Sequence, residues 1–179
     1  MILDKQVGVF LNLVHNRTKQ YITGIFQQHG FNITPEQFLV MDALWDNGVM
    51  SQQELADNIM KDKNSIVKLL DGLEKKDLVR RVADKADRRK NMIELTPYAL
   101  SIKDDVTDAA LEAISHIIKD IPTDELRLFI RTLGKMAINM NEDTDLLALA
   151  GNTPAQPQDF PIPDNNSPAQ PEDSQTTLF

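Results

Sequence analysis

The chain has 179 residues, of which 41% are hydrophobic and 26% are charged, enough for one domain of ordinary size with a buried core. Cysteine is absent, which excludes a disulfide framework, a thiol nucleophile, a thiol redox sensor and any cysteine-ligated zinc site. The formal net charge of −8, taken over the whole chain, argues against nucleic acid as a partner. The apolar runs are too short to span a bilayer, and Asp4 and Lys5 interrupt the N-terminus too early for a secretory signal. We therefore expect a cytoplasmic protein with no membrane partner.

The charge is unevenly distributed along the chain. Residues 142–179 contain seven acidic side chains and no basic one, so the rest of the chain has a net charge of only −1. Residues 61–90 contain eleven basic and six acidic side chains, a local net charge of +5. An acidic protein with this asymmetry can still have a phosphate-binding face, although a solvated helix surface would show the same local excess.

Helix starts are marked by a capping hydroxyl that lies next to proline or three residues before Glu or Gln. These starts are Thr34-Pro35 with Gln37, Ser51 with Glu54, Thr96-Pro97 and Pro122-Thr123. Together with the apolar spacing, they predict helices over residues 4–28, 35–46, 51–58, 62–76, 97–119 and 123–141.

Apolar residues at three-four spacing run along the first and the last predicted helices. In the first helix they are Leu3, Val7, Phe10, Val14, Tyr21 and Ile25, and in the last they are Leu126, Phe129, Ile130, Leu133, Met136, Ala137 and Met140. Core packing within one subunit is one interpretation. We favour a helical homodimer interface, because two long apolar stripes need more partner surface than a small central domain supplies.

Two short helices joined by a brief turn are followed by two strand-like runs, residues 79–82 and 92–95. The second short helix begins at Asp62 and directs Lys63, Asn64 and Lys68 outward near its start. A helix fits the major groove of DNA, where Asn can pair with adenine and Lys can reach guanine acceptors. The loop between the strands is too long for a two-residue turn, so we expect a hairpin with a basic tip that can enter a minor groove.

The sequence therefore predicts one surface that contacts double-stranded DNA. Its predicted members are Ser51, Gln52, Lys61, Lys63, Asn64, Ser65, Lys68, Arg88, Arg89 and Lys90. The alternative is a winged-helix protein–protein adaptor that does not bind DNA and whose basic side chains are simply solvated.

Residues 51–59, 65–79, 84–89 and 93–97 resemble the MarR family of bacterial transcriptional regulators, and the helix order follows that family over residues 1–141. The family's wing signature, Asp-x-Arg-Asp-Arg-Arg, is matched by Asp84, Asp87, Arg88 and Arg89, whereas Ala86 replaces its first arginine. The family usually has glycine where Asp77 ends the recognition helix; Asp tolerates the required left-handed backbone better than most residues.

The resemblance implies a mainly α fold: a winged helix-turn-helix with a two-stranded wing and N- and C-terminal dimerisation helices. It also implies a homodimer on a pseudopalindromic operator, usually a repressor and often released by a small ligand. In domain terms we expect an N-terminal dimerisation helix over 1–34, the DNA-binding domain over 35–97 and C-terminal dimerisation helices over 98–141. Residues 142–179, rich in proline and acidic side chains, are predicted to be a disordered tail.

Family ligands are often small, aromatic and anionic, and lie where the dimer helices meet the winged helix. The residues here that would form such a site are Phe10, Val14, Arg17, Met41 and Trp45, with Arg17 as the anion partner. For Trp45, packing in the core is the alternative. The scattered His15, His29 and His116 predict no metal site, and no catalytic set or phosphate-binding glycine loop is visible. We therefore expect neither an enzyme nor a bound cofactor.

Overall fold

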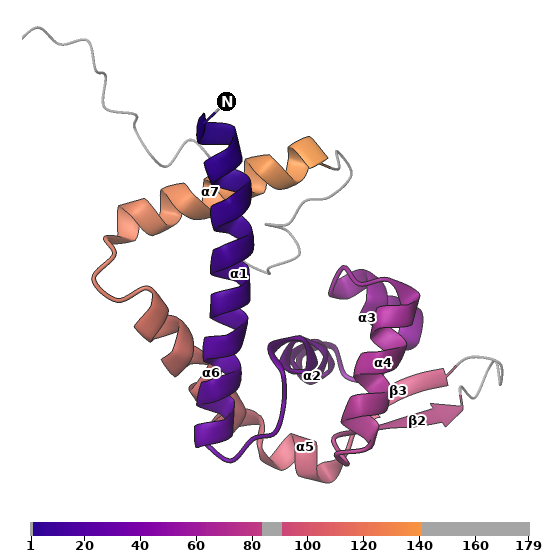
Figure 1. The fold of residues 1–179 in the computed structure, drawn as a ribbon. Helices are drawn as coiled ribbons and strands as arrows, with labels where there is room; N and C mark the ends of the chain where they lie inside the picture. Colours follow the sequence, from indigo (N-terminus) through magenta and orange to yellow (C-terminus); the bar gives the residue numbers. More distant parts are fainter. Residues whose placement is uncertain (1, 84–90, 141–179) are drawn as a thin grey trace, which may run out of the picture. The chain divides into compact units, whose positions relative to one another are not determined.

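The computed structural model describes residues 2–83 and 91–140. In chain order the elements are α1 (Ile2–Gln28), α2 (Pro35–Asn47), β1 (Met50–Ser51), α3 (Gln52–Asn58), α4 (Lys63–Glu74), β2 (Val79–Ala83), β3 (Asn91–Leu95), α5 (Pro97–Ser101), α6 (Lys103–Ile117) and α7 (Thr123–Met140) (Figure 1). The described residues divide into two units, one up to residue 128 and one from residue 129 to 140. The predicted wing-tip residues Arg88, Arg89 and Lys90 and the predicted tail lie outside the described residues.

The capping side chains begin the helices as predicted. The Thr34 hydroxyl accepts a hydrogen bond from the Gln37 backbone, and the Gln37 side chain accepts one in return from the Thr34 backbone. Ser51 and Glu54 form the same reciprocal pair at the start of α3. These bonds satisfy backbone N–H groups that have no partner within the helix, which is why each helix begins where it does.

The prediction of a single helix over 97–119 is wrong, because the chain bends at Ile102 and forms α5 and α6 instead. Ile102 has φ −100° and ψ 6°, outside the helical range. The Ser101 hydroxyl donates to the Tyr98 carbonyl oxygen at 2.8 Å, and serine hydroxyls bonded back to the preceding turn bend helices. Apolar periodicity continues across the bend, so the spacing of the sequence concealed it.

The described strands form one antiparallel sheet in the order β1-β3-β2. The two strands of the predicted hairpin are β2 and β3, with Val79 opposite Leu95 and Arg81 opposite Ile93. The third strand, β1, was not predicted. It is two residues long, too short for an alternating pattern, and its Ser51 also caps α3.

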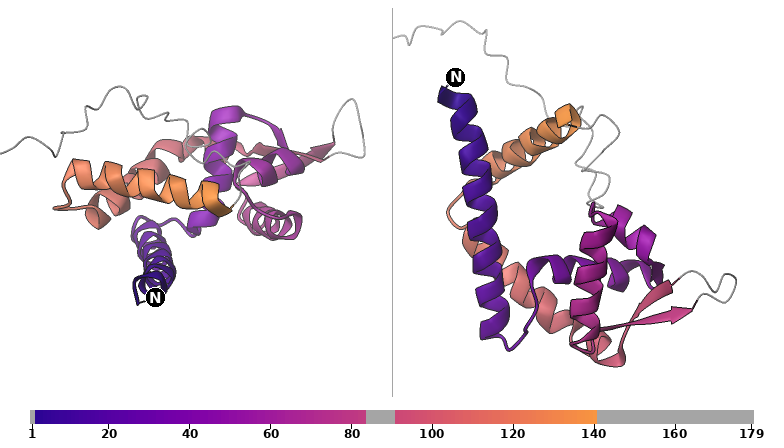
Figure 2. Two further views of the ribbon diagram at one scale, coloured as in Figure 1. Left: turned by 90° about the horizontal axis from the view of Figure 1, so that it is seen from above. Right: turned by 45° about the vertical axis from the view of Figure 1, so that its right-hand side comes forward.

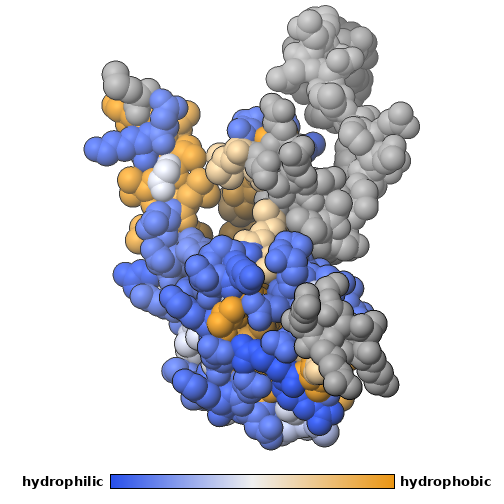
Figure 3. Space-filling model, turned by 90° about the vertical axis from the view of Figure 1, so that its right-hand side faces the viewer, coloured by the Kyte–Doolittle hydropathy of each residue, from blue (hydrophilic) through white to orange (hydrophobic). Residues whose placement is uncertain are grey.

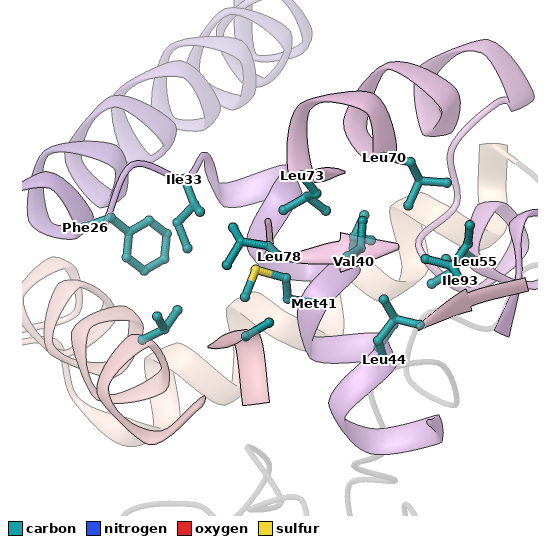
Figure 4. Packing of buried hydrophobic residues seen from close by; sticks show 14 of the residues in the cluster. Phe26, Ile33, Val40, Met41, Leu44, Leu55, Leu70, Leu73, Leu78 and Ile93 are labelled. Atoms are coloured by element: carbon teal, nitrogen blue, oxygen red, sulfur yellow. The ribbon is translucent and has the colours of Figure 1, made fainter. Parts of the chain in front are cut away.

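One hydrophobic core holds the first unit together. Figure 4 shows Phe26 at the end of α1, Val40, Met41 and Leu44 of α2, and Leu70 of α4 within the same cluster. The cluster also includes apolar residues of α3, the sheet, α5 and α6. Because α1 contributes only its C-terminal turns, its N-terminal half projects away from the winged helix (Figure 2).

The end of α4 has the left-handed residue that the sequence predicts. Asp77 has φ 55°, and its backbone N–H bonds to the Glu74 carbonyl oxygen at 3.0 Å. The Thr96 hydroxyl, at the start of α5, donates to the Asp77 carbonyl oxygen at 2.6 Å. The turn that leads from α4 into β2 is therefore tied to the end of β3.

Replacing Asp77 with glycine should raise stability slightly, because glycine removes the steric cost of the left-handed backbone, roughly 1 kcal/mol before its own entropy is subtracted. Asp77→Ala should lower stability, because alanine cannot make the local hydrogen bonds that let Asp tolerate this conformation. Urea unfolding of the three proteins measures both effects. A midpoint for Asp77→Gly below that of Asp77→Ala would contradict this account of the turn.

Candidate nucleic-acid interface

A tight turn sets the angle between α3 and α4. Met60 in the turn has φ 54°, and the Lys61 backbone N–H bonds to the Ala56 carbonyl oxygen at 2.9 Å. Leu55 and Ala56 on α3 are buried in the core, so the helix cannot rotate without exposing them. The turn and this burial together hold α4 in one orientation relative to α3.

Asp62 caps the first turn of α4. One carboxylate oxygen accepts hydrogen bonds from the backbone N–H groups of Asn64 and Ser65, each at 2.9 Å, and the other accepts from the Ser65 hydroxyl. The hydrogen bond from the Ser65 side chain, followed by those from the backbone, holds the pKa of Asp62 below its ordinary value. The ionised carboxylate therefore fixes the end of the helix from which Lys63 and Asn64 project.

The two faces of α4 have opposite character. Ile66, Leu70 and Leu73 are fully buried in the core. Lys63, Asn64 and Lys68 are exposed, as is Lys61 in the turn before the helix. Asn64 and Lys68 are four residues apart and share one side of the helix. The side chains predicted to meet base edges are thus brought together on the outer face of α4.

Three further predicted contact residues are half-buried, and two of them hydrogen-bond within the chain at the starts of α3 and α4. Ser51 caps α3, Gln52 is the first residue of that helix, and the Ser65 hydroxyl bonds to Asp62. A hydroxyl that donates to a carboxylate still has lone pairs that can accept a hydrogen bond. Ser65 lies on α4 between the exposed Asn64 and Lys68, whereas Ser51 and Gln52 lie at the start of α3; for all three, a contact with DNA stays a prediction.

Two arginines in the basic segment form ion pairs within the winged helix. Arg80 on β2 pairs with Glu94, the residue opposite it on β3. Arg81 reaches α4, where its guanidinium contacts Asp71 at 2.6 Å and also contacts Glu74. The second pairing fastens the base of the wing to α4. Sequence reasoning missed it, although two acids three residues apart on one helix face present a site for a guanidinium.

A third base, Lys76, donates to the Gln37 side-chain oxygen at 2.8 Å. The number of basic side chains in the segment therefore overstates the number that are free to meet a polyanion. Among the described residues of the segment, the exposed lysines without an ion-pair partner are Lys61, Lys63, Lys68 and Lys75. Three of these four lie in the turn and the first turns of α4.

The residues of the predicted effector site lie in different surroundings within the single chain. Met41 is fully buried in the core, whereas Phe10 and Val14 are 57% and 53% exposed on α1. Arg17 lines a shallow depression along α1 with Gln20 and Tyr21. The effector site therefore stays a prediction.

Trp45 packs against the core and meets Phe38 edge to face, with 6.2 Å between ring centroids. Its indole N–H donates to the Ala99 carbonyl oxygen at 3.2 Å. These contacts agree with the interpretation of Trp45 as a core residue, because its ring is packed and its N–H has a hydrogen-bond acceptor.

Two histidines join α1 and the turn after it to α6. His29 Nε2 lies 2.8 Å from Glu112 Oε2, and the His116 ring stacks on Tyr21 with 5.3 Å between centroids. Within residues 2–83 and 91–140, no group of three or more His, Asp or Glu side chains could hold a metal ion. In the same ranges, no helix combines the length and hydropathy needed to cross a bilayer.

Comparison with known proteins gives consistent matches. Residues 33–90 match the sequence model of the MarR family. The HTH-type transcriptional regulator MhqR of Bacillus subtilis is 23% identical over 141 residues, covering 78% of this chain and 96% of MhqR. A crystal structure of a MarR mutant from E. coli complexed with operator DNA has a TM-score of 0.67 at 20% identity, over 73% of this chain and 93% of that one.

A structure of Bordetella bronchiseptica BpsR, from work on the regulation of its DNA binding by 6-hydroxynicotinic acid, has a TM-score of 0.62. It is 26% identical, over 74% of this chain and 98% of that one. These matches confirm the resemblance seen in the sequence and the winged helix-turn-helix fold. MhqR, which matches over most of both chains, is a transcriptional regulator.

The cap at Asp62 predicts a specific dependence of stability on pH. Because the pKa of Asp62 is lower in the folded protein, its contribution is complete above the unfolded-state pKa, about 3.9, and is lost as the pH falls through the folded value. Asp62→Asn keeps a good capping side chain that does not titrate. Urea unfolding from about pH 6 down to about pH 3, a range that brackets the unfolded-state pKa, should show a steeper loss in the wild type. Parallel pH profiles would contradict the assignment.

Proposed function

We propose, since this chain belongs to the MarR family of winged helix-turn-helix DNA-binding transcriptional regulators, that it is a homodimeric repressor of a pseudopalindromic operator. In this proposal α4 of each subunit enters the major groove. The base edges are met by Asn64 and Lys68, and phosphates are met by Lys61 and Lys63. Arg88, Arg89 and Lys90 of the wing add contacts to the adjacent minor groove.

The observation that carries this proposal is the outer face of α4. Its lysines are exposed and have no ion-pair partner among the described residues, while the opposite face is sealed into the core. Arg80 and Arg81, by contrast, are already paired with acids. A surface that keeps several cations unpaired at the start of one helix is suited to a polyanion.

The proposal of a homodimer is supported by apolar residues that one chain leaves exposed. On α1 these include Leu3, Val7, Phe10, Leu11 and Val14. Figure 3 shows hydrophobic side chains gathered over the N-terminal part of α1, at the upper left. The helix α7 also has exposed apolar residues, among them Phe129, Ile130 and Ile138. Apolar faces of this extent on helices are typical of subunit interfaces.

We also propose that DNA binding is released by a small aromatic or anionic effector near Phe10, Val14, Arg17, Met41 and Trp45. The support is BpsR, a protein of the same fold whose DNA binding is regulated by 6-hydroxynicotinic acid. Binding to a chromosomal operator requires the cytoplasm as the compartment. The division into dimerisation helices over 1–34 and 98–141, the DNA-binding domain over 35–97 and a tail over 142–179 is part of the same proposal.

Binding of the full chain to duplex DNA should fall steeply with salt, because each phosphate contact releases counterions. Asn64→Ala should reduce the preference for a duplex selected from a random pool by about 1–3 kcal/mol for each bidentate pairing with a base that it abolishes. Lys63→Ala should instead weaken the selected and the scrambled duplex alike and lower the salt slope by about one for each phosphate that is no longer neutralised. Fluorescence anisotropy over a salt series measures both.

Salt-insensitive or undetectable binding by the wild type would favour the protein–protein adaptor and overturn the regulator proposal. Equal weakening of both duplexes by Asn64→Ala would show that this side chain contacts phosphate rather than base edges.

The dimer is tested by Phe10→Glu, which places a charge on the proposed interface where its desolvation is costly. The side chain is exposed within one chain, so the subunit itself should remain folded. Asn12→Asp is the matched control, since Asn12 is exposed on the other side of the same helix from Phe10 and gains the same charge. Sedimentation should find dimers for the wild type and control and monomers for Phe10→Glu. A monomeric wild type at micromolar concentration would refute the dimer.

A further inference from the structure

One buried amide links the start of α2 to the end of α4. Gln37 is 6% exposed, which is unusual for a glutamine. Its Oε1 accepts two hydrogen bonds, one from the Thr34 backbone N–H at 3.2 Å and one from the Lys76 ammonium at 2.8 Å. Both partners are donors, so they fix which end of the amide is the oxygen and use both of its lone pairs.

The other end of the same amide lies against the recognition helix. A Cβ added to Gly72 would be 2.6 Å from Gln37 Nε2, closer than non-bonded atoms approach. Glycine is a poor residue for the interior of a helix, yet α4 has it beside the Gln37 amide. The missing side chain makes room for the amide beside the backbone of α4.

Lys76 completes the arrangement. It is half-buried, and loss of hydration lowers the pKa of its ammonium. The neighbouring Lys75 is exposed and has no ion-pair partner among the described residues. One of two adjacent lysines is therefore turned inward to Gln37, at the end of the helix where a positive charge is favourable.

We propose that Gln37 is a positioning residue for DNA recognition, and that its amide, seated over Gly72 and held by Lys76, sets how α4 lies on α2. This inference deepens the proposed function, since it rests on α4 being the helix that reads DNA. A small change in the position of α4 displaces Asn64 and Lys68 relative to base edges, whereas phosphate contacts from long lysines tolerate it better. The amide therefore governs sequence preference more than overall affinity.

The first experiment compares the effect of Gly72→Ala in the presence and in the absence of the Gln37 side chain. Gly72→Ala should lower the preference of the wild type for its selected duplex over a scrambled one by about tenfold, because the new Cβ displaces the Gln37 amide. In a Gln37→Ala background the space is open, so adding Gly72→Ala should cause no further loss and should raise the melting temperature through helix propensity. Neither substitution changes the charge, so binding to the scrambled duplex should stay constant.

The second experiment uses the two adjacent lysines. Lys76→Met and Lys75→Met each remove one positive charge, so both should weaken binding to the scrambled duplex to a similar extent. Only Lys76→Met should also reduce sequence preference. Gln37→Glu, which keeps an acceptor for both Thr34 and Lys76, should retain the preference that Gln37→Met loses. Thermal unfolding of every variant gives its melting temperature, so that binding can be measured at a temperature at which all variants are folded.

Equal effects of Lys75→Met and Lys76→Met on both duplexes would overturn the proposal, because Lys76 would then act as a surface charge. Equal loss from Gly72→Ala with and without Gln37 would overturn it as well. A wild type that selects no duplex from the random pool would defeat both this inference and the proposed function. A wild type that selects one, with variants that keep its preference, would defeat this inference alone.

Discussion

The packing of α4 against α2 is the contact on which the arrangement of the winged helix depends. The inner face of α4 is buried against the apolar residues of α2, among them Val40 and Leu44, and this burial is the main favourable term available to a short helix. A helix of this length gains little stability on its own in water, so its outer residues are ordered only because its inner residues are packed. The positions of the outward-facing Lys63, Asn64 and Lys68 are therefore set by the packing of the core.

Polar contacts add direction to that packing. Hydrophobic contact is non-directional, so by itself it would allow α4 and the wing to slide or rotate over α2. The pairing of Arg81 with Asp71 and Glu74 fixes the wing to α4, and the bond from Thr96 to the Asp77 carbonyl fixes the turn between them. Each of these contacts is partly exposed and contributes modestly to stability. Their importance is that they specify one geometry for the surface that, in the proposed function, meets DNA.

Several apolar residues of α1 lie outside the hydrophobic core. Only the C-terminal turns of α1 enter the core, and Leu3, Phe10 and Val14 remain exposed. A long helix that buries one end and exposes an apolar face along the other presents the kind of surface that subunit interfaces cover. In the proposed dimer, association would supply the missing partner surface and would also set the spacing between the two recognition helices.

The sequence by itself determined the features that depend on neighbouring residues. The capping boxes at Thr34 and Ser51, the cap at Asp62 and the left-handed residue Asp77 could all be predicted, because each is a local bond or a local backbone preference. The outer face of α4 followed from helical spacing, which left Asn64 and Lys68 on the side opposite the apolar residues.

Only the tertiary structure decided which elements meet and which charged side chains pair with other residues of the chain. The two-residue strand β1 exists because β3 lies beside it, and the pairing of Lys76 with Gln37 joins residues that are far apart in the chain. No local pattern distinguishes Lys76 from Lys75, because the difference between them arises from what lies opposite each side chain after folding. The physical reason is that capping and periodicity act over a few residues, whereas burial and ion pairing depend on distances that folding alone creates.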